Sequence, residues 1–158
     1  MPTDAVPIEL RVSRHIAAAP ERVFDAWLAP GTMACFLFAT PGGVMQTVAN
    51  DPRVGGRFTV VERRAHGDAS HYGVWHVLAR PTRLVFAFST ERHDPAADAV
   101  SITLTPEGDG CLVTLVHTLA PEWADDADRT RGGWTSMLDT LARVLDATDT
   151  QSPPGDRT

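Results

Sequence analysis

The chain has 158 residues, of which 43% are hydrophobic and 22% are charged, and its formal net charge at pH 7 is −6. This length fits one domain, and the sequence has no run of about 20 apolar residues that would span a membrane. The negative charge argues against a nucleic-acid-binding protein, because such binding depends on clustered positive charge. All 14 basic residues are arginine, which excludes chemistry that needs a lysine nucleophile.

The first residues of the chain and its cysteines set the expected compartment. Residues 1–7 are predicted to be flexible, and they lack the basic start and the apolar stretch of a secretory signal. We therefore expect a cytoplasmic protein. Cys35 and Cys111 lie far apart in the sequence, so we expect both to be reduced core residues. The six histidines have no short metal-ligand spacing, and we predict neither a metal site nor a cofactor.

The N-terminal third predicts one strand and two helices. Apolar and polar residues alternate over residues 8–18, which is typical of a strand with one covered face. A helix is predicted to begin at Pro20, because proline is well tolerated in the first helical turn. The pair Pro30-Gly31 is predicted to end that helix, and a second short helix is expected over residues 32–37.

Short runs of alternating apolar residues then predict six more strands. Turn residues such as Gly, Pro, Asn and Asp separate the runs, which is typical of an antiparallel meander. The predicted strands cover residues 44–49, 57–64, 71–78, 84–89, 100–105 and 112–119.

The last third of the chain predicts a long closing helix. Residues 121–130 are read as an acidic loop or an irregular helix start, and the helix is expected to run to about Ala147. Residues 148–158 are predicted to be a disordered tail. Apolar residues recur with the period of an amphipathic helix at Trp134, Leu138, Leu141 and Leu145.

This order of elements predicts a single α+β domain over residues 8–147. An antiparallel sheet of six or seven strands needs one face covered, and the closing helix has a suitable apolar stripe. A curved sheet wrapped around such a helix commonly leaves a cavity between the two.

Several stretches also match a known family in their order and spacing. They are residues 16–27, 51–58, 73–75 and 80–86, followed by His117, Gly133, Trp134 and Leu138. On these residues the chain resembles the START-like (SRPBCC, helix-grip) superfamily, in the branch named after the activator of Hsp90 ATPase. The resemblance implies the helix-grip fold with an internal pocket. It implies no particular reaction, because members include ligand binders, a few enzymes and a co-chaperone domain.

His117 is the first candidate site residue. It lies in register with Val113 and Leu115, so its side chain should point to the covered face of the sheet. One reading is a pocket histidine that donates a hydrogen bond or acts as a general base. The other is a core histidine bonded to a carbonyl or to the closing helix.

Glu62 is the second candidate. The alternation Phe58, Val60, Glu62 places a carboxylate on the buried face, where it must be neutralised, paired or solvated. A strand end near solvent, or a bulge that turns the side chain outward, is the alternative. If both side chains line the cavity, Glu62 and His117 could act as a proton-transfer pair.

Large side chains are predicted to shape the pocket, with plain core packing as the alternative for most of them. Trp75 and Trp134 are the preferred pocket residues. His71 and Tyr72 are expected at the pocket mouth or on the surface, and Trp123 in a lid or partner contact. The predicted ligand-contact set is Trp27, Phe36, Phe58, Glu62, Trp75, Phe86, Phe88, His117, Trp134 and Leu138.

Three functions are compatible with these observations. We favour a module that binds a small hydrophobic or amphipathic molecule. The first alternative is an enzyme of the cyclase, dehydratase or hydrolase type that moves a proton with Glu62 or His117. The second is an interaction protein, either an Hsp90-type co-chaperone or a stress-response partner. A homodimer through an edge strand or the Trp123 loop is also expected to be feasible.

Overall fold

The computed structural model describes residues 8–90, 98–119 and 121–150. Within these ranges it has seven strands, three α-helices and one 3₁₀ helix. In chain order they are β1 (Ile8–Ile16), α1 (Pro20–Ala26), α2 (Pro30–Phe36), β2 (Val44–Asn50), β3 (Arg57–Arg64), β4 (Gly67–Ala79), β5 (Arg83–Ser89), β6 (Asp98–Glu107), β7 (Gly110–Leu119), η2 (Pro121–Asp126) and α3 (Ala127–Thr150).

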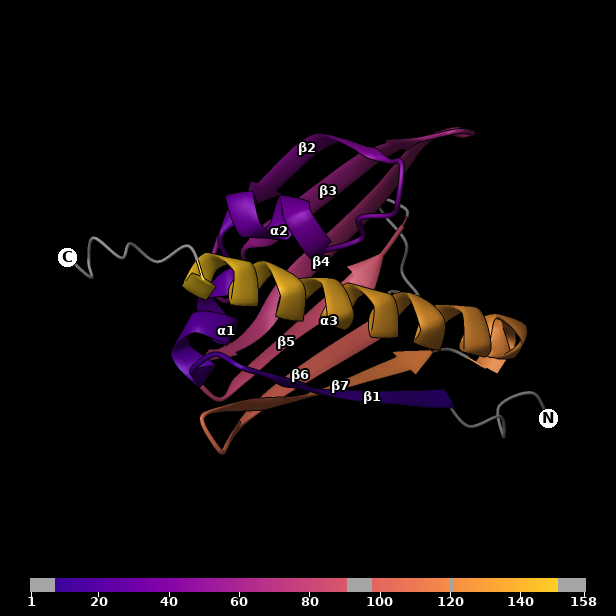
Figure 1. The fold of residues 1–158 in the computed structure, drawn as a ribbon. Helices are drawn as coiled ribbons and strands as arrows, with labels where there is room; N and C mark the ends of the chain where they lie inside the picture. The colour runs from indigo at the N-terminus through magenta and orange to yellow at the C-terminus, as the bar shows by residue number, and fades with distance from the viewer. Residues whose placement is uncertain (1–7, 91–97, 120, 151–158) are drawn as a thin grey trace.

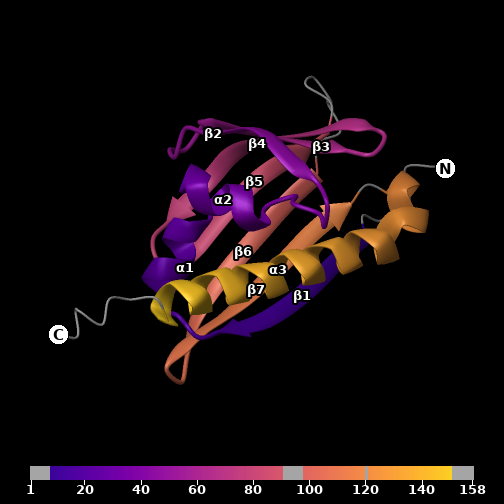
Figure 2. The same ribbon diagram turned by 45° about the horizontal axis from the view of Figure 1, so that its top comes forward.

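The strands form one antiparallel sheet in the order β1-β7-β6-β5-β4-β3-β2. The sheet is curved, and α3 runs across one of its faces with α1 near its C-terminal end (Figure 1). Helix α2 lies between α3 and β2, as the turned view also shows (Figure 2). This arrangement confirms the predicted α+β helix-grip fold, with the seven strands wrapped around the closing helix.

Several elements differ in length from their predicted bounds. Helix α2 begins at Pro30, because proline suits the first helical position and so starts the helix that follows α1. Strand β4 begins at Gly67, four residues early. The positive φ of Gly67, 121°, allows a tight turn directly after Arg64, and polar residues then continue the pairing. Helix α3 extends from Ala127 to Thr150.

The predictions for the ends of the chain fall largely outside the described residues, and one of the two predictions for the cysteines is wrong. The predicted flexible start, residues 1–7, and residues 151–158 of the predicted tail lie outside the described residues. Both cysteines are free: Cys111 is buried as expected, whereas Cys35 is exposed on α2, so its assignment to the core is wrong. In the described part of the chain, no helix has the length and apolar character needed to span a membrane.

The core lies between the inner face of the sheet and α3. The side chains of Leu138 and Leu141 on α3 have no accessible surface, and Trp134 has 1%. Burying a leucine side chain of this kind stabilises the fold by roughly 1.5–3 kcal/mol. The packing also depends on Gly73 of β4, where a Cβ atom would overlap the ring of Phe58 on the paired strand. Glycine at this position lets the ring lie flat across β4.

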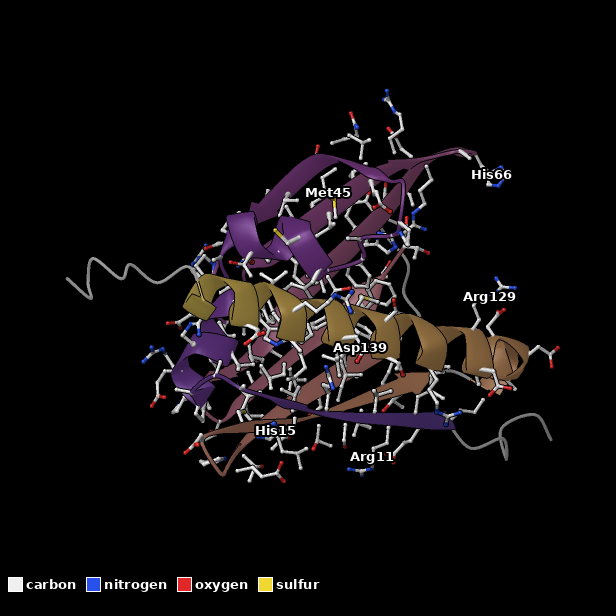
Figure 3. The ribbon with its side chains drawn as sticks, in the orientation of Figure 1. Arg11, His15, Met45, His66, Arg129 and Asp139 are labelled. Atoms are coloured by element: carbon white, nitrogen blue, oxygen red, sulfur yellow. The ribbon has the colours of Figure 1, made fainter. Side chains whose placement is uncertain are left out.

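Some side chains at the margins of the fold are exposed, whereas Met45 packs against the core. In Figure 3, His66 projects outward from the turn between β3 and β4, and Met45 lies on β2 close to α2. Asp139 lies on α3, where its carboxylate is 3.2 Å from Nε of Arg14 on β1. This exposed ion pair joins the closing helix to the edge strand, and such pairs contribute about 0–1 kcal/mol.

Candidate functional site

The interior between the sheet and α3 has one sealed end and one partly open end. On β5, Phe86 has no accessible surface, whereas Phe88, two residues further along the same face, is partly exposed. On the neighbouring β4, Trp75 has no accessible surface and His71 has 9%. Exposure therefore rises in the same direction along both paired strands.

We call the partly exposed end of this interior the open end and define it by six side chains. Four different elements and the connection after α2 bring them together. They are Phe38, His71, Phe88, His117, Trp134 and Met137.

The rings of the open end form one continuous cluster. The ring of Phe38 is stacked on that of His71, with centroids 4.3 Å apart and an angle of 2° between the planes. Phe38 also stacks on Phe88 at 5.0 Å and meets Trp134 edge-on at 5.6 Å. His117 meets the ring of Phe88 edge-on at 5.8 Å. Such aromatic pairs add about 0.5–1.5 kcal/mol each beyond simple burial.

His117 is hydrogen-bonded to the closing helix, which is one of the two readings that the sequence left open. The indole Nε1–H of Trp134 donates to Nδ1 of His117 over 2.9 Å, and the contact is buried. Because an indole nitrogen can only donate, Nδ1 must carry a lone pair, and the imidazole is neutral in this arrangement. A role for His117 as a general base stays a prediction.

Glu62 is buried, with 1% of its surface exposed, and its carboxylate is fully engaged. Its oxygens accept hydrogen bonds from the backbone N–H and the hydroxyl of Thr40, both at 2.8 Å. Nε of Arg64 donates to the same carboxylate at 2.6 Å. Gly43 packs directly on this group, because a Cβ atom there would overlap the Glu62 carboxylate.

These contacts also determine the charge state of Glu62. Burial by itself would raise the pKa of the carboxyl group, since it disfavours the charged form. The hydrogen bonds from Thr40 and Arg64, with the positive charge of Arg64, outweigh that effect and lower the pKa below its ordinary value. Glu62 is therefore a paired, ionised carboxylate, as the sequence allowed.

Glu62 and His117 stand on strands that are well separated in the sheet. Strand β3 carries Glu62 and β7 carries His117, and three strands lie between them. At about 4.8 Å per strand, the two backbones are about 19 Å apart along the curved sheet. Each side chain also has the partners described above. Their action as a proton-transfer pair stays a prediction.

His71 is the polar side chain at the open end that the sequence left between pocket mouth and surface. It is buried on the inner face of β4, and its Nδ1 atom has no hydrogen-bond partner among the described residues. Burial, together with the nearby charge of Arg64, lowers the pKa of His71 to about 4, although contacts with the Val60 backbone and Glu62 act in the opposite direction. The imidazole is therefore neutral near pH 7.

Phe38 was missed by the sequence reasoning, although it lies at the centre of the cluster. Its φ of 55° is in the left-handed region, which is unfavourable for a bulky side chain. Two contacts hold it there: its N–H donates to Sδ of Met137 at 3.1 Å, and its carbonyl accepts from Nη2 of Arg64 at 3.1 Å. A non-glycine residue with positive φ leaves no mark in a hydrophobic pattern.

The other predicted ligand-contact residues lie at the sealed end of the interior. Trp75 is held there by Asn50, whose side-chain oxygen accepts from the indole N–H at 2.7 Å and whose amide donates to the carbonyl of Leu28 at 2.8 Å. Their contact with a ligand stays a prediction, as does the role of Trp123, whose side chain lies outside the described part. The residues of this group, each with 0–1% accessible surface, are Trp27, Phe36, Phe58, Trp75, Phe86 and Leu138.

Comparison with known proteins agrees with this architecture. The family described as "Activator of Hsp90 ATPase homolog 1-like protein" matches residues 17–146. A crystal structure of a protein from Chromobacterium violaceum is 26% identical with a TM-score of 0.76, covering 87% of this chain and 96% of that one. The solution structure of an AHSA1-like protein from Aeromonas hydrophila is 23% identical with a TM-score of 0.76, covering 90% and 94%. No curated protein matches the chain.

Proposed function

This chain belongs to the family of activator of Hsp90 ATPase homolog 1-like proteins, and from that premise we propose that it binds a small hydrophobic or amphipathic molecule at the open end, between the sheet and α3. One observation carries the proposal: the aromatic inner face is sealed around Trp75 and Phe86 but partly exposed at Phe88, next to His71. Partly exposed aromatic surface next to a buried core is a favourable surface for an apolar ligand.

The closing helix offers room beside this cluster. Met137 of α3 is partly buried, and Gly133 lies one turn before it on the same helix. A Cβ atom at Gly133 would meet only the terminal methyl group of Met137, at 3.9 Å. Gly133 is itself exposed, so the helix is open to solvent beside Met137, which supports the approach of a ligand to the Met137 side chain from this side.

A thermal-shift screen tests the proposal. The purified protein is heated with aromatic, fatty-acid, steroid and polyketide-like compounds. A compound present at 100 times its Kd should stabilise the fold by about 2.7 kcal/mol. For a domain of this size that free energy raises Tm by roughly 5–10 °C.

Two glycine variants test whether a compound binds at the open end. Gly133→Leu should fill the space beside Met137 and abolish the shift in Tm given by any compound that stabilises the wild type. Gly132→Leu is the matched control, because Gly132 is exposed like Gly133 but a Cβ atom there meets nothing within 4 Å, Met137 included. Equal responses of both variants and the wild type would contradict binding at the open end. A flat response to every compound would favour a protein partner, which pull-down with Hsp90 and an ATPase assay would test.

A further inference from the structure

His71 has an unsatisfied polar atom at a place where a ligand could satisfy it. Its side chain is about nine-tenths buried, and Nδ1 lacks a hydrogen-bond partner in the described part of the chain. Buried polar atoms in folded proteins are nearly always hydrogen-bonded, so such an atom calls for a specific explanation. His117, the other histidine of the open end, already has a partner within the fold, namely Trp134.

A second buried polar atom without a partner helps to define what is special about His71. Nε1 of Trp27 is also unsatisfied among the described residues, but Trp27 has no accessible surface and packs against the buried rings of Phe36 and Trp134. His71 instead contacts Phe88, which is partly exposed. Of these two side chains, His71 is the one that contacts a partly exposed residue.

The ring that covers His71 is held in an unfavourable conformation. Phe38 stacks on the imidazole, and its positive φ is sterically disfavoured for a residue with a large side chain. Strained residues of this kind persist only where the surrounding contacts hold them, and here those contacts come from Met137 and Arg64. Movement of the connection between α2 and β2 would relieve the strain and expose the face of the imidazole ring on which Phe38 stacks.

The charges around His71 favour a neutral ligand. The nearest charged groups are Arg64 and Glu62, and they neutralise each other through a hydrogen bond of 2.6 Å. The rings of Phe38 and Phe88 contact the imidazole, and the uncharged backbone of Val60 lies beside it. A net charge on the ligand would lose hydration here without gaining an unpaired counter-charge.

We propose that the open end binds a neutral aromatic molecule carrying a hydroxyl group, which hydrogen-bonds to Nδ1 of His71 in the plane of the imidazole ring. A hydroxyl group both donates and accepts, so it can pair with Nδ1 in either tautomer of a neutral imidazole. This inference rests on the proposed function and adds the polar group by which the ligand is recognised.

Calorimetric titration with three naphthalene derivatives of similar size tests the inference. 2-Naphthol can donate and accept, 2-methoxynaphthalene can only accept, and 2-methylnaphthalene can do neither. The wild type should bind 2-naphthol about 3- to 10-fold more tightly than 2-methylnaphthalene, which is the usual net effect of one hydrogen bond. The result with 2-methoxynaphthalene shows whether Nδ1 donates or accepts.

Two variants on β4 assign the preference to one side chain. His71→Phe keeps a ring for Phe38 to stack on and should bind 2-naphthol and 2-methylnaphthalene equally. His76→Phe changes an exposed histidine of the same strand and should keep the wild-type preference. If His71→Phe fails to fold, the ¹⁵N shift of Nδ1 in the wild type is decisive, because 2-naphthol should move it strongly and 2-methylnaphthalene should not.

The outcomes separate this inference from the function it rests on. Equal binding of 2-naphthol and 2-methylnaphthalene by the wild type would overturn the role of His71 but leave the ligand-binding proposal standing. Retention of the preference in His71→Phe would do the same. If no naphthalene binds but other compound classes raise Tm in the thermal screen, this inference alone is overturned. If no compound binds in the titration or raises Tm in the screen, both this inference and the ligand-binding proposal are overturned.

Discussion

The indole nitrogen of Trp134 lies 2.9 Å from Nδ1 of His117, and this buried hydrogen bond ties the closing helix to β7. It holds the imidazole in one neutral tautomer and keeps the large indole ring against the sheet. The same indole ring also contacts Phe38. The hydrogen bond therefore couples the packing of α3 against β7 to the packing of Phe38 at the open end.

Removal of this hydrogen bond should destabilise the protein more than removal of a similar indole that has none. Trp134→Phe leaves Nδ1 of His117 buried without its partner, whereas Trp27→Phe removes an N–H that has no partner among the described residues. We expect the free energy of unfolding to fall by about 1–2 kcal/mol more in Trp134→Phe than in Trp27→Phe. Urea denaturation of both variants measures this difference, and equal losses would contradict it.

The Glu62 carboxylate should stabilise the fold only while it is ionised. Glu62→Gln removes the charge that accepts from Thr40 and Arg64, and we expect a loss of about 2–3 kcal/mol at pH 7. Because the pKa of Glu62 is lowered in the fold, this contribution is fully present above its ordinary value of 4.5. It disappears as the pH falls through the folded-state pKa, so wild type and variant should converge in acid.

A matched control for Glu62 is an exposed ion pair at the end of the same strand. Arg63 and Asp68 are paired at 3.1 Å, and both side chains are exposed. Asp68→Asn should change the free energy of unfolding by less than about 1 kcal/mol. A cost for Glu62→Gln no larger than this control would show that the buried network does not hold the connection between α2 and β2.

His71 should make the protein less stable as the pH falls from neutrality. The pKa of His71 is about 4 in the folded protein and ordinarily 6.5. At a pH between these values, His71 is therefore protonated in the unfolded chain but neutral in the folded protein. Stability should therefore fall by up to about 1.4 kcal/mol per pH unit, or about 2 kcal/mol between pH 7 and pH 5. His71→Phe should lack this part of the loss, and His76→Phe should retain it. Parallel pH profiles for all three proteins would refute the assignment.

The two glycines of α3 should be replaceable by alanine with a gain in stability. Glycine in a helix is about 0.8–1.0 kcal/mol less favourable than alanine. A Cβ atom has space at both Gly132 and Gly133. Each alanine variant should therefore raise Tm by roughly 2–4 °C. Gly73→Ala is the opposite case and should lower Tm, because its Cβ atom would collide with Phe58.

The amino-acid sequence by itself determined the faces of the elements and their order. Alternation along β3 and β7 predicted that Glu62 and His117 point inward, and both are buried. The period along α3 predicted a buried stripe that includes Trp134 and Leu138, which the structure confirms. These features are local, because the side-chain direction in a strand or helix repeats over a few residues.

Only the tertiary structure decided which partners these side chains find. Glu62 takes two of its hydrogen bonds from Thr40, 22 residues earlier in the chain, and His117 takes one from Trp134, 17 residues later. Phe38 covers His71 because a connection with positive φ folds back over the sheet. A hydrophobic pattern carries no information on such contacts, since they depend on the curvature of the sheet and on the path of the connections between its strands.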